Sequence, residues 1–131
     1  MINVILKVKG SEPTVYLYFY NTNFTHKYLE FKYLLKKELN ATDQDAYFAG
    51  CTIALKTIIQ KCSKAENVNI YSSNQPVMKQ MKGDYKINKK TQQNLYKKNK
   101  NIENNIAGEV KYQWVRSNNL HPQYLRIKSS H

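Results

Sequence analysis

Apolar and polar residues alternate with a period of two near the N-terminus, a pattern typical of β-strands. The alternation predicts a first strand that starts at Ile2 and stops at Gly10 and a second strand over 14–20. In the second strand three apolar side chains alternate with three tyrosines, Tyr16, Tyr18 and Tyr20. A Tyr- and Leu-rich stretch over 26–37 predicts a third strand after a polar turn. Three successive strands with short polar links predict an antiparallel meander.

The period then changes to that of a helix, which we expect from Asp43 to Cys62. Apolar and thiol side chains recur there at spacings of three and four, at Phe48, Cys51, Leu55, Ile58 and Cys62. Thr42 supplies an N-cap, and Asp43 and Asp45 place negative charge in the first turn. The two cysteines lie about 16 Å apart along this helix, which is too far for a disulfide. Because they are close to three whole turns apart, we expect two buried thiols on one face.

The second half of the chain predicts a strand over 68–71 and a short helix over 74–81, with Pro76 in its first turn. The stretch 86–105 is nearly all Lys, Asn and Gln, yet a stripe at helical spacing runs through it: Ile87, Thr91, Leu95, Lys98, Ile102 and Ile106. We expect a long amphipathic helix there, whose basic outer face carries Lys89, Lys90, Lys97 and Lys100. That face is either merely solvated or a phosphate-binding surface.

The last elements are a strand over 109–115, a polar turn over 116–119 and a terminal helix over 120–127. The order of three strands, helix, strand, two helices, strand and helix predicts an α/β fold. We expect a mixed sheet with helices on both of its faces. A chain of 131 residues fits one domain, residues 1–131, with an ordinary apolar core.

The net charge of +12, from 21 Lys and Arg against 9 Asp and Glu, predicts attraction to polyanions, with nucleic acid first and an anionic membrane surface second. Only Arg116 and Arg126 are arginines, and a lysine excess suits phosphate attraction better than base reading. A bias toward A/T-rich codons would explain the same excess of lysine. The charge alone therefore leaves both explanations open.

Other features of the composition exclude some classes of protein. The mean hydropathy is -0.70, and the longest clean apolar run is far shorter than the roughly 20 residues that span a bilayer. The N-terminus does not have the pattern of a signal peptide, so we expect a cytoplasmic protein without a membrane partner. His26, His121 and His131 show no ligand spacing, which leaves a zinc site without support.

Four short sequence motifs, in the correct order along the chain, resemble those of the type 1 ribonuclease H family. They are Val-Lys-Gly-Ser at 8–11, Thr-Asp-Gln-Asp-Ala-Tyr-Phe at 42–48, Ile-Tyr-Ser-Ser-Asn-Gln at 70–75 and Trp-Val-Arg-Ser-Asn-Asn at 114–119. The resemblance covers nearly the whole chain. It implies a ribonuclease H-like fold, in which an antiparallel meander and two parallel strands form a five-stranded mixed sheet.

The resemblance also implies that the catalytic chemistry of the family is lost. The family holds two divalent cations with four carboxylates, and the matching positions here are Lys9, Tyr47, Ser73 and Gln123. Asp45 points about 200° away from Tyr47 around the helix, and Asp43 is explained more simply as a capping residue. We therefore expect a pseudoenzyme with no catalytic residues, no metal and no cofactor. The alternative is an active nuclease in which relocated acids, Asp43 among them, hold the metal.

What the resemblance leaves is a fold that binds nucleic acid, as a duplex or an RNA/DNA hybrid, without cutting it. The residues expected to contact nucleic acid are Lys9, Gly10, Ser11, Thr42, Asn74, Gln75, Lys89, Lys90, Lys97 and Arg116. The alternative is a protein-interaction or dimerisation module that reuses the fold as a scaffold. The tyrosine row of the second strand fits either hypothesis, since it can stack on bases or form a subunit contact.

Overall fold

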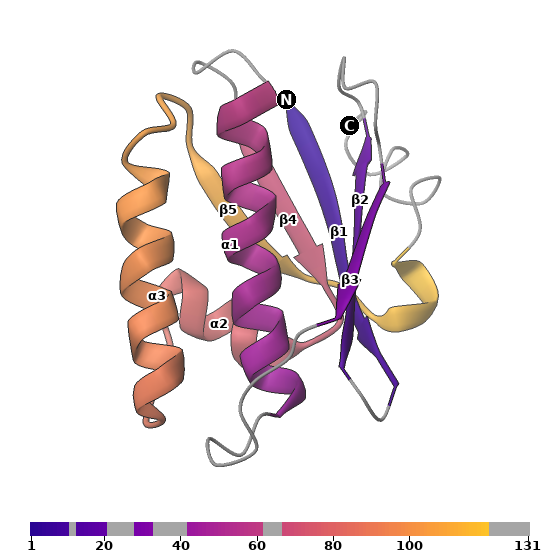
Figure 1. Ribbon diagram of the computed structural model, residues 1–131, viewed down its shortest axis with the longest axis vertical. Coiled ribbons are helices and arrows are strands. Elements are labelled where there is room, and N and C mark those ends of the chain that lie inside the picture. Colours follow the sequence, from indigo (N-terminus) through magenta and orange to yellow (C-terminus); the bar gives the residue numbers. More distant parts are fainter. Residues whose placement is uncertain (11–12, 21–27, 33–41, 62–66, 121–131) are drawn as a thin grey trace.

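The five strands form one mixed sheet in the computed structural model, which describes residues 1–10, 13–20, 28–32, 42–61 and 67–120 (Figure 1). The strands are β1 (Ile2–Lys9), β2 (Thr14–Tyr20), β3 (Tyr28–Lys32), β4 (Val68–Ser72) and β5 (Val110–Trp114). Their order across the sheet is β3-β2-β1-β4-β5. Neighbours are antiparallel from β3 to β1, and β4 and β5 run parallel to β1. The predicted meander with two parallel strands is confirmed.

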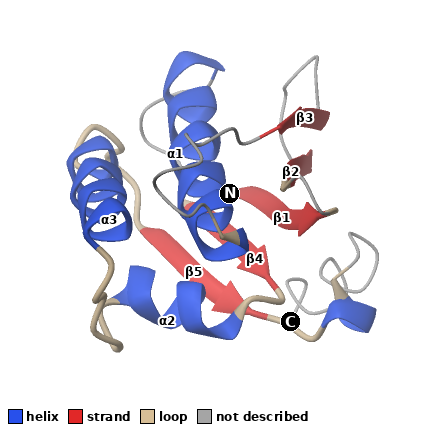
Figure 2. Ribbon diagram, turned by 60° about the horizontal axis from the view of Figure 1, so that its bottom comes forward, coloured by secondary structure: helices blue, strands red, loops and turns tan. Residues whose placement is uncertain are grey.

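Three helices pack against the larger apolar cluster of the molecule: α1 (Asp43–Lys61), α2 (Gln75–Lys82) and α3 (Lys90–Glu103). Figure 2 shows α1 and α3 side by side above one face of the sheet. The predicted polar turn at 116–119 contains a short 3-10 helix, η2 (Ser117–Asn119). The expected terminal helix lies outside the described residues, except for Leu120, as do the third-strand residues beyond Tyr28–Lys32. None of the described helices is long and apolar enough to cross a bilayer.

The main core lies between α1 and the sheet. The predicted helical stripe of α1 is confirmed, because Phe48, Cys51, Leu55 and Ile58 are all buried. Gly50 lets the helix approach the sheet closely, since a Cβ built on it would lie 2.5 Å from Leu6 Cδ1. Burial raises the pKa of the Cys51 thiol to about 12, which keeps it protonated at neutral pH. Cys62 is outside the described part of the chain.

The contact between α3 and α1 differs from the predicted stripe. Lys98, which the spacing placed on the inner face, is exposed, whereas Gln92 and Asn99 are buried. Asn99 donates a hydrogen bond of 3.2 Å to the Phe48 carbonyl oxygen and forms a second one with the Thr52 hydroxyl. The helix starts at Lys90 rather than at residue 86, and it is held to α1 by a buried amide. An apolar pattern cannot indicate this, because the buried group is polar.

The opposite face of the sheet carries a smaller apolar cluster of Ile5, Tyr20, Tyr71 and Leu120. Beside it three amide side chains are joined across β1, β4 and β5. Gln113 donates to Asn69 at 3.1 Å, and Asn69 donates to Asn3 at 3.2 Å. These cross-strand amide pairs contribute to the register of the parallel strands.

Candidate nucleic-acid interface

The candidate site lies at one edge of the sheet, where β1 and β4 end and α1 and α2 begin (Figure 1). Since the two strands are parallel and adjacent, their last residues, Lys9 and Ser72, reach the same edge. Gly10 follows β1 with a φ of 96°, a left-handed conformation that favours glycine. The chain can therefore turn immediately after Lys9 without backbone strain. The Lys9 side chain is exposed.

Tyr47 occupies the centre of this edge, because it comes from the second turn of α1 and is only 9% exposed. Burial raises the pKa of its phenol, although hydrogen-bonding contacts with the Val8 backbone and the side chains of Ser73 and Ser72 work in the other direction. The nearby charge of Asp43 raises the pKa further. Tyr47 is therefore a neutral phenol at pH 7 that connects the ends of β1 and β4 to α1.

The turn after β4 is ordered by side-chain hydrogen bonds. The Asn74 amide nitrogen donates to Ser72 Oγ at 3.2 Å, and Asn74 Oδ1 accepts from the Val77 amide at 3.0 Å. Asn74 is thus the N-cap of α2 rather than its first helical residue, and Pro76 lies in the first turn as the sequence predicted. The cap occupies the Asn74 oxygen, whereas Gln75 is exposed.

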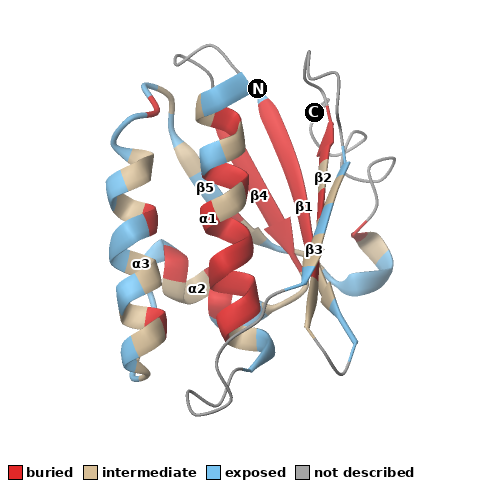
Figure 3. Cartoon of the chain, in the orientation of Figure 1, coloured by how far each residue is buried: buried red, intermediate tan, exposed pale blue. Residues whose placement is uncertain are grey.

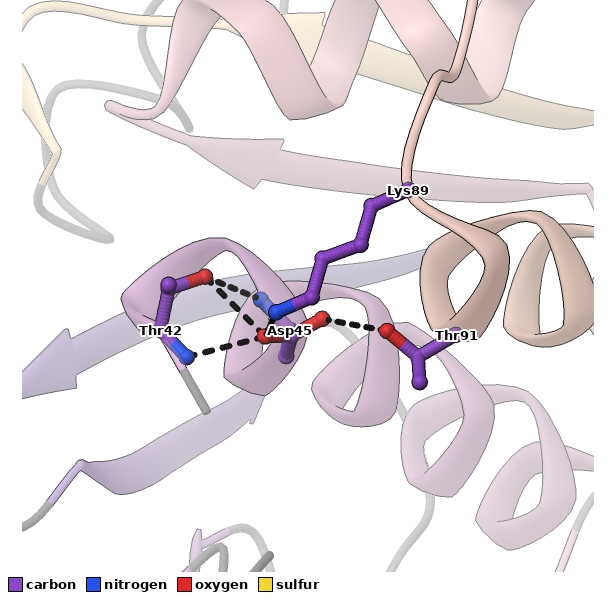
Figure 4. A network of polar contacts seen from close by, with 4 residues as sticks. All are labelled: Thr42, Asp45, Lys89 and Thr91. Carbon is purple, nitrogen blue, oxygen red and sulfur yellow. Dashed lines mark hydrogen bonds and ion pairs between the residues drawn. The ribbon is translucent and has the colours of Figure 1, made fainter. Parts of the chain in front are cut away.

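The start of α1 is a capping box in which Thr42 and Asp45 bond to each other. Asp45 Oδ2 accepts hydrogen bonds from the Thr42 amide at 2.8 Å and from the Thr42 hydroxyl at 3.0 Å. Figure 4 shows that Lys89 and Thr91 also contact this carboxylate, at 2.6 Å and 3.1 Å. Asp45 is fully buried and directed toward α3, away from the site, as the helical offset indicated.

The expected basic face of α3 is divided between structural and exposed lysines. Lys89 is bound to Asp45, and Lys100 pairs with Glu103 at 3.2 Å and lies over the ring of Tyr112. Lys90 and Lys97 are exposed, as is Arg116 after β5. Because α1 and α3 start beside each other, Lys90 lies toward the same end of the molecule as Thr42. Ser11 and Gln123 lie outside the described residues.

Trp114 lies beside the candidate edge, and the sequence analysis did not select it as a candidate site residue. It ends β5 opposite Ser72, its indole nitrogen donates to the Ser73 carbonyl oxygen at 3.2 Å, and its side chain is 42% exposed. Strand periodicity places Trp114 and Tyr112 on the same face of β5, yet Tyr112 is buried. Only the position of Trp114 at the strand end, level with the end of β4, distinguishes the two. An exposed indole beside the site is suited to stacking on a base or sugar.

Within the described ranges, no three His, Cys, Asp or Glu side chains are grouped so that they could hold a metal ion. The side chains at the centre of the edge, those of Lys9, Tyr47 and Ser73, are a cation, a phenol and a hydroxyl. None of them is an anionic ligand, so this donor set does not suit Mg²⁺. Asp43, which acts on Tyr47 electrostatically, is a single carboxylate.

The fold is similar to that of ribonucleases H of type 1. RNase H1 from the halophilic archaeon Halobacterium salinarum superposes with a TM-score of 0.74 at 10% identity, covering 91% of this chain and 88% of that one. LC11-RNase H1 in complex with an RNA/DNA hybrid gives a TM-score of 0.73 at 12% identity over 90% and 87% of the two chains. The N-terminal RNase H domain of a Mycobacterium tuberculosis protein gives 0.64 at 13% identity over 90% of each.

These likenesses define the class of the fold, a ribonuclease H-like α/β domain, and the expected fold class is thereby confirmed. No protein-family model matches the sequence, and no curated protein does.

Proposed function

We propose that this protein binds nucleic acid, as a duplex or an RNA/DNA hybrid, at the edge formed by β1, β4 and α1, and that it does not cleave it. The observation that carries the proposal is the set of side chains at that edge. Lys9 is exposed at the end of β1, and neutral Tyr47 fills the centre between Val8 and Ser73. A fold whose relative LC11-RNase H1 has been solved with a hybrid thus presents a cation there.

Hydrolysis by two metal ions needs anionic oxygen ligands that hold the ions close together. A charged ammonium has no lone pair to donate, so Lys9 cannot be such a ligand. Tyr47 cannot replace a carboxylate either, because burial raises the pKa of its phenol and disfavours the phenolate. In our proposal, the side chains at the positions that the resemblance matches to carboxylates no longer bind metal ions, but the surface around them still binds nucleic acid.

Phosphate binding needs a cation and accessible donors, and the edge offers both. The Lys9 ammonium is a mobile point charge, and the Gly10 backbone can be approached closely because no side chain shields it. Thr42 is exposed at the start of α1, but its amide and hydroxyl both donate to the carboxylate of the capping box, so it borders the site without supplying a donor. Exposed Lys90 and Arg116 flank the edge. Such contacts are made to charged phosphates and not to bases. We therefore expect binding that is insensitive to base sequence and weakens steeply with salt.

The experiment is fluorescence anisotropy of a labelled RNA/DNA hybrid, with double-stranded DNA and double-stranded RNA in parallel, at two salt concentrations. Lys9→Glu should weaken binding more than tenfold at low salt. Lys61→Glu is the matched control, because it makes the same charge change at an exposed lysine at the other end of α1, about 27 Å away along the helix. Equal effects of the two variants would show that only net charge matters and would overturn the proposed site.

A further inference from the structure

The outer face of β2 and β3 carries three tyrosines that reach the surface, Tyr16, Tyr18 and Tyr28, which we call the tyrosine patch. Tyr28 is exposed, and Tyr16 and Tyr18 are half-buried. Along β2 these tyrosines alternate with Val15, Leu17 and Phe19, whose side chains are fully buried. Since successive side chains of a strand point to opposite faces, the tyrosines lie on the face away from α1. Tyr28 is 51% exposed, and Figure 3 shows β3 alternating between exposed and intermediate residues at the sheet edge.

The rings of the patch are close enough to form one surface. Tyr18 of β2 is directly opposite Tyr28 of β3 in the register, and the ring centroids of Tyr16 and Tyr28 are 6.4 Å apart. The Tyr28 hydroxyl donates to Glu30 at 3.1 Å, which steadies the exposed ring. Tyr20 continues the row but is buried in the smaller apolar cluster.

Lysines border the tyrosine patch along β1. Lys7 is paired with Tyr16 in the register, and Lys9 is paired with Thr14 one step farther along the same face. Side chains two residues apart on a strand are about 6.7 Å apart, so the two ammonium groups can follow a phosphate backbone that crosses the strand ends. Glu30, opposite Tyr16, is the one described carboxylate in this register, and it faces the Tyr28 hydroxyl.

We propose that the tyrosine patch binds single-stranded nucleic acid, whose bases stack on Tyr16, Tyr18 and Tyr28 while Lys7 and Lys9 attract its phosphates. Flat aromatic rings bordered by cations are the arrangement that takes single strands without sequence preference. Lys9, which ends β1 at the candidate interface, lies one step along the same face beyond the pair of Lys7 and Tyr16 at the border of the patch. A single strand that extends from a bound duplex would therefore reach the patch without a gap.

A second copy of this chain fits the patch less well than a single strand does. A face-to-face contact over the patch would bring the Lys7 and Lys9 ammonium groups of two molecules close together, each molecule carrying a net charge of +12. Like charges in an interface oppose association. Nucleic acid instead supplies the opposite charge together with flat rings. Dimerisation, whether face to face or through the β3 edge, is the competing outcome that the test must exclude.

The test compares binding of a labelled oligonucleotide of about ten thymidines with binding of a blunt RNA/DNA hybrid. Tyr28→Leu should weaken oligothymidine binding about tenfold, because it removes the ring on which a base stacks, and should leave hybrid binding within twofold. Tyr28→Phe keeps the ring and should bind like the parent protein. Glu30→Gln removes the carboxylate and should strengthen oligothymidine binding.

The proposal is overturned if Tyr28→Leu binds oligothymidine as well as the parent protein does. It is also overturned if sedimentation shows a dimer that Tyr28→Leu dissociates while oligothymidine binding stays the same. Hybrid binding tests the proposed duplex site separately. If the protein does not bind hybrid but its oligothymidine binding depends on Tyr28, the proposal for the patch stands and the proposed duplex site is wrong.

Discussion

Asp45 and Lys89 join the first turn of α1 to the N-cap of α3 through an ion pair of 2.6 Å (Figure 4). The carboxylate is completely buried, whereas the Lys89 side chain is 32% exposed. Thr42 and Thr91 supply the remaining hydrogen bonds to the same carboxylate. A buried charge with this many partners fixes the geometry of the two helix starts, and it is costly to disturb.

Asp45→Asn should therefore destabilise the protein at neutral pH, by about 2–3 kcal/mol in the free energy of unfolding. Burial raises the pKa of Asp45, but the hydrogen bonds from Lys89, Thr42 and Thr91 outweigh it and lower the pKa below its usual value. A carboxylate with a lowered folded pKa stabilises the fold above about pH 4, and this contribution is lost as the pH falls through the folded pKa.

Urea unfolding followed by circular dichroism at pH 7 and at pH 3 measures this difference. The gap between the parent protein and Asp45→Asn should narrow at the lower pH. Asp84→Asn, at an exposed aspartate, is the control and should change the unfolding midpoint little. A gap that is equal at both pH values would contradict the role of the charge.

The buried pair of Thr52 and Asn99 should behave as one unit. Asn99→Ala should cost about 2 kcal/mol, because it leaves a cavity and removes the donor to the Phe48 carbonyl oxygen. Thr52→Val should cost about 1 kcal/mol, and the double variant should cost less than the sum. The double-mutant cycle in urea measures this coupling, with exposed Asn101→Ala as the control. Strict additivity would show that the two side chains do not depend on each other.

Tyr47→Phe should retain nucleic-acid binding and lose about 1 kcal/mol of stability, because the hydroxyl contacts the Val8 backbone and the Ser72 and Ser73 side chains. The ring would still fill the centre of the edge. Thermal unfolding and hybrid anisotropy on the same sample check both statements. If binding fell together with stability, the phenol hydroxyl would itself be part of the binding surface.

Lys98→Glu should raise the stability slightly at low salt. Lys98 of α3 repels Lys56 of α1 and lowers the pKa of Lys56, so the charged pair opposes the helix contact. Replacing one ammonium by a carboxylate changes the repulsion into attraction. Since both groups are at the surface, the gain should be small and should disappear in 1 M salt, where screening acts over about 3 Å. A gain that persists in high salt would have another cause.

The sequence was sufficient to predict β1, β2 and α1, because each buries a face made of apolar residues at a regular spacing. The contact of α3 could not be predicted in the same way. Its buried residues, Gln92 and Asn99, are polar, and Lys98 follows the spacing yet is exposed. Only tertiary packing shows that a buried amide bonds to the backbone of a helix some fifty residues earlier.

The resemblance selected the candidate site residues, and only their positions in the fold follow from local sequence signals. Thr42, Lys9 and Asn74 lie at ends of elements, and such ends can be located from local sequence signals. The ion pair of Lys89 could not be predicted in this way, since its partner Asp45 is 44 residues away along the chain. Trp114 was missed because strand periodicity treats it like Tyr112, although one ends the strand in solvent and the other is buried.

Binding without cleavage is the central claim, and one gel assay tests it directly. A labelled RNA/DNA hybrid is incubated with excess protein in Mg²⁺, in Mn²⁺ and in EDTA. One half of each sample is run on a native gel, and the other half is deproteinised and run under denaturing conditions. We predict a complete shift and full-length strands in all three conditions. Shortened RNA that appears with either metal and disappears in EDTA would contradict the account.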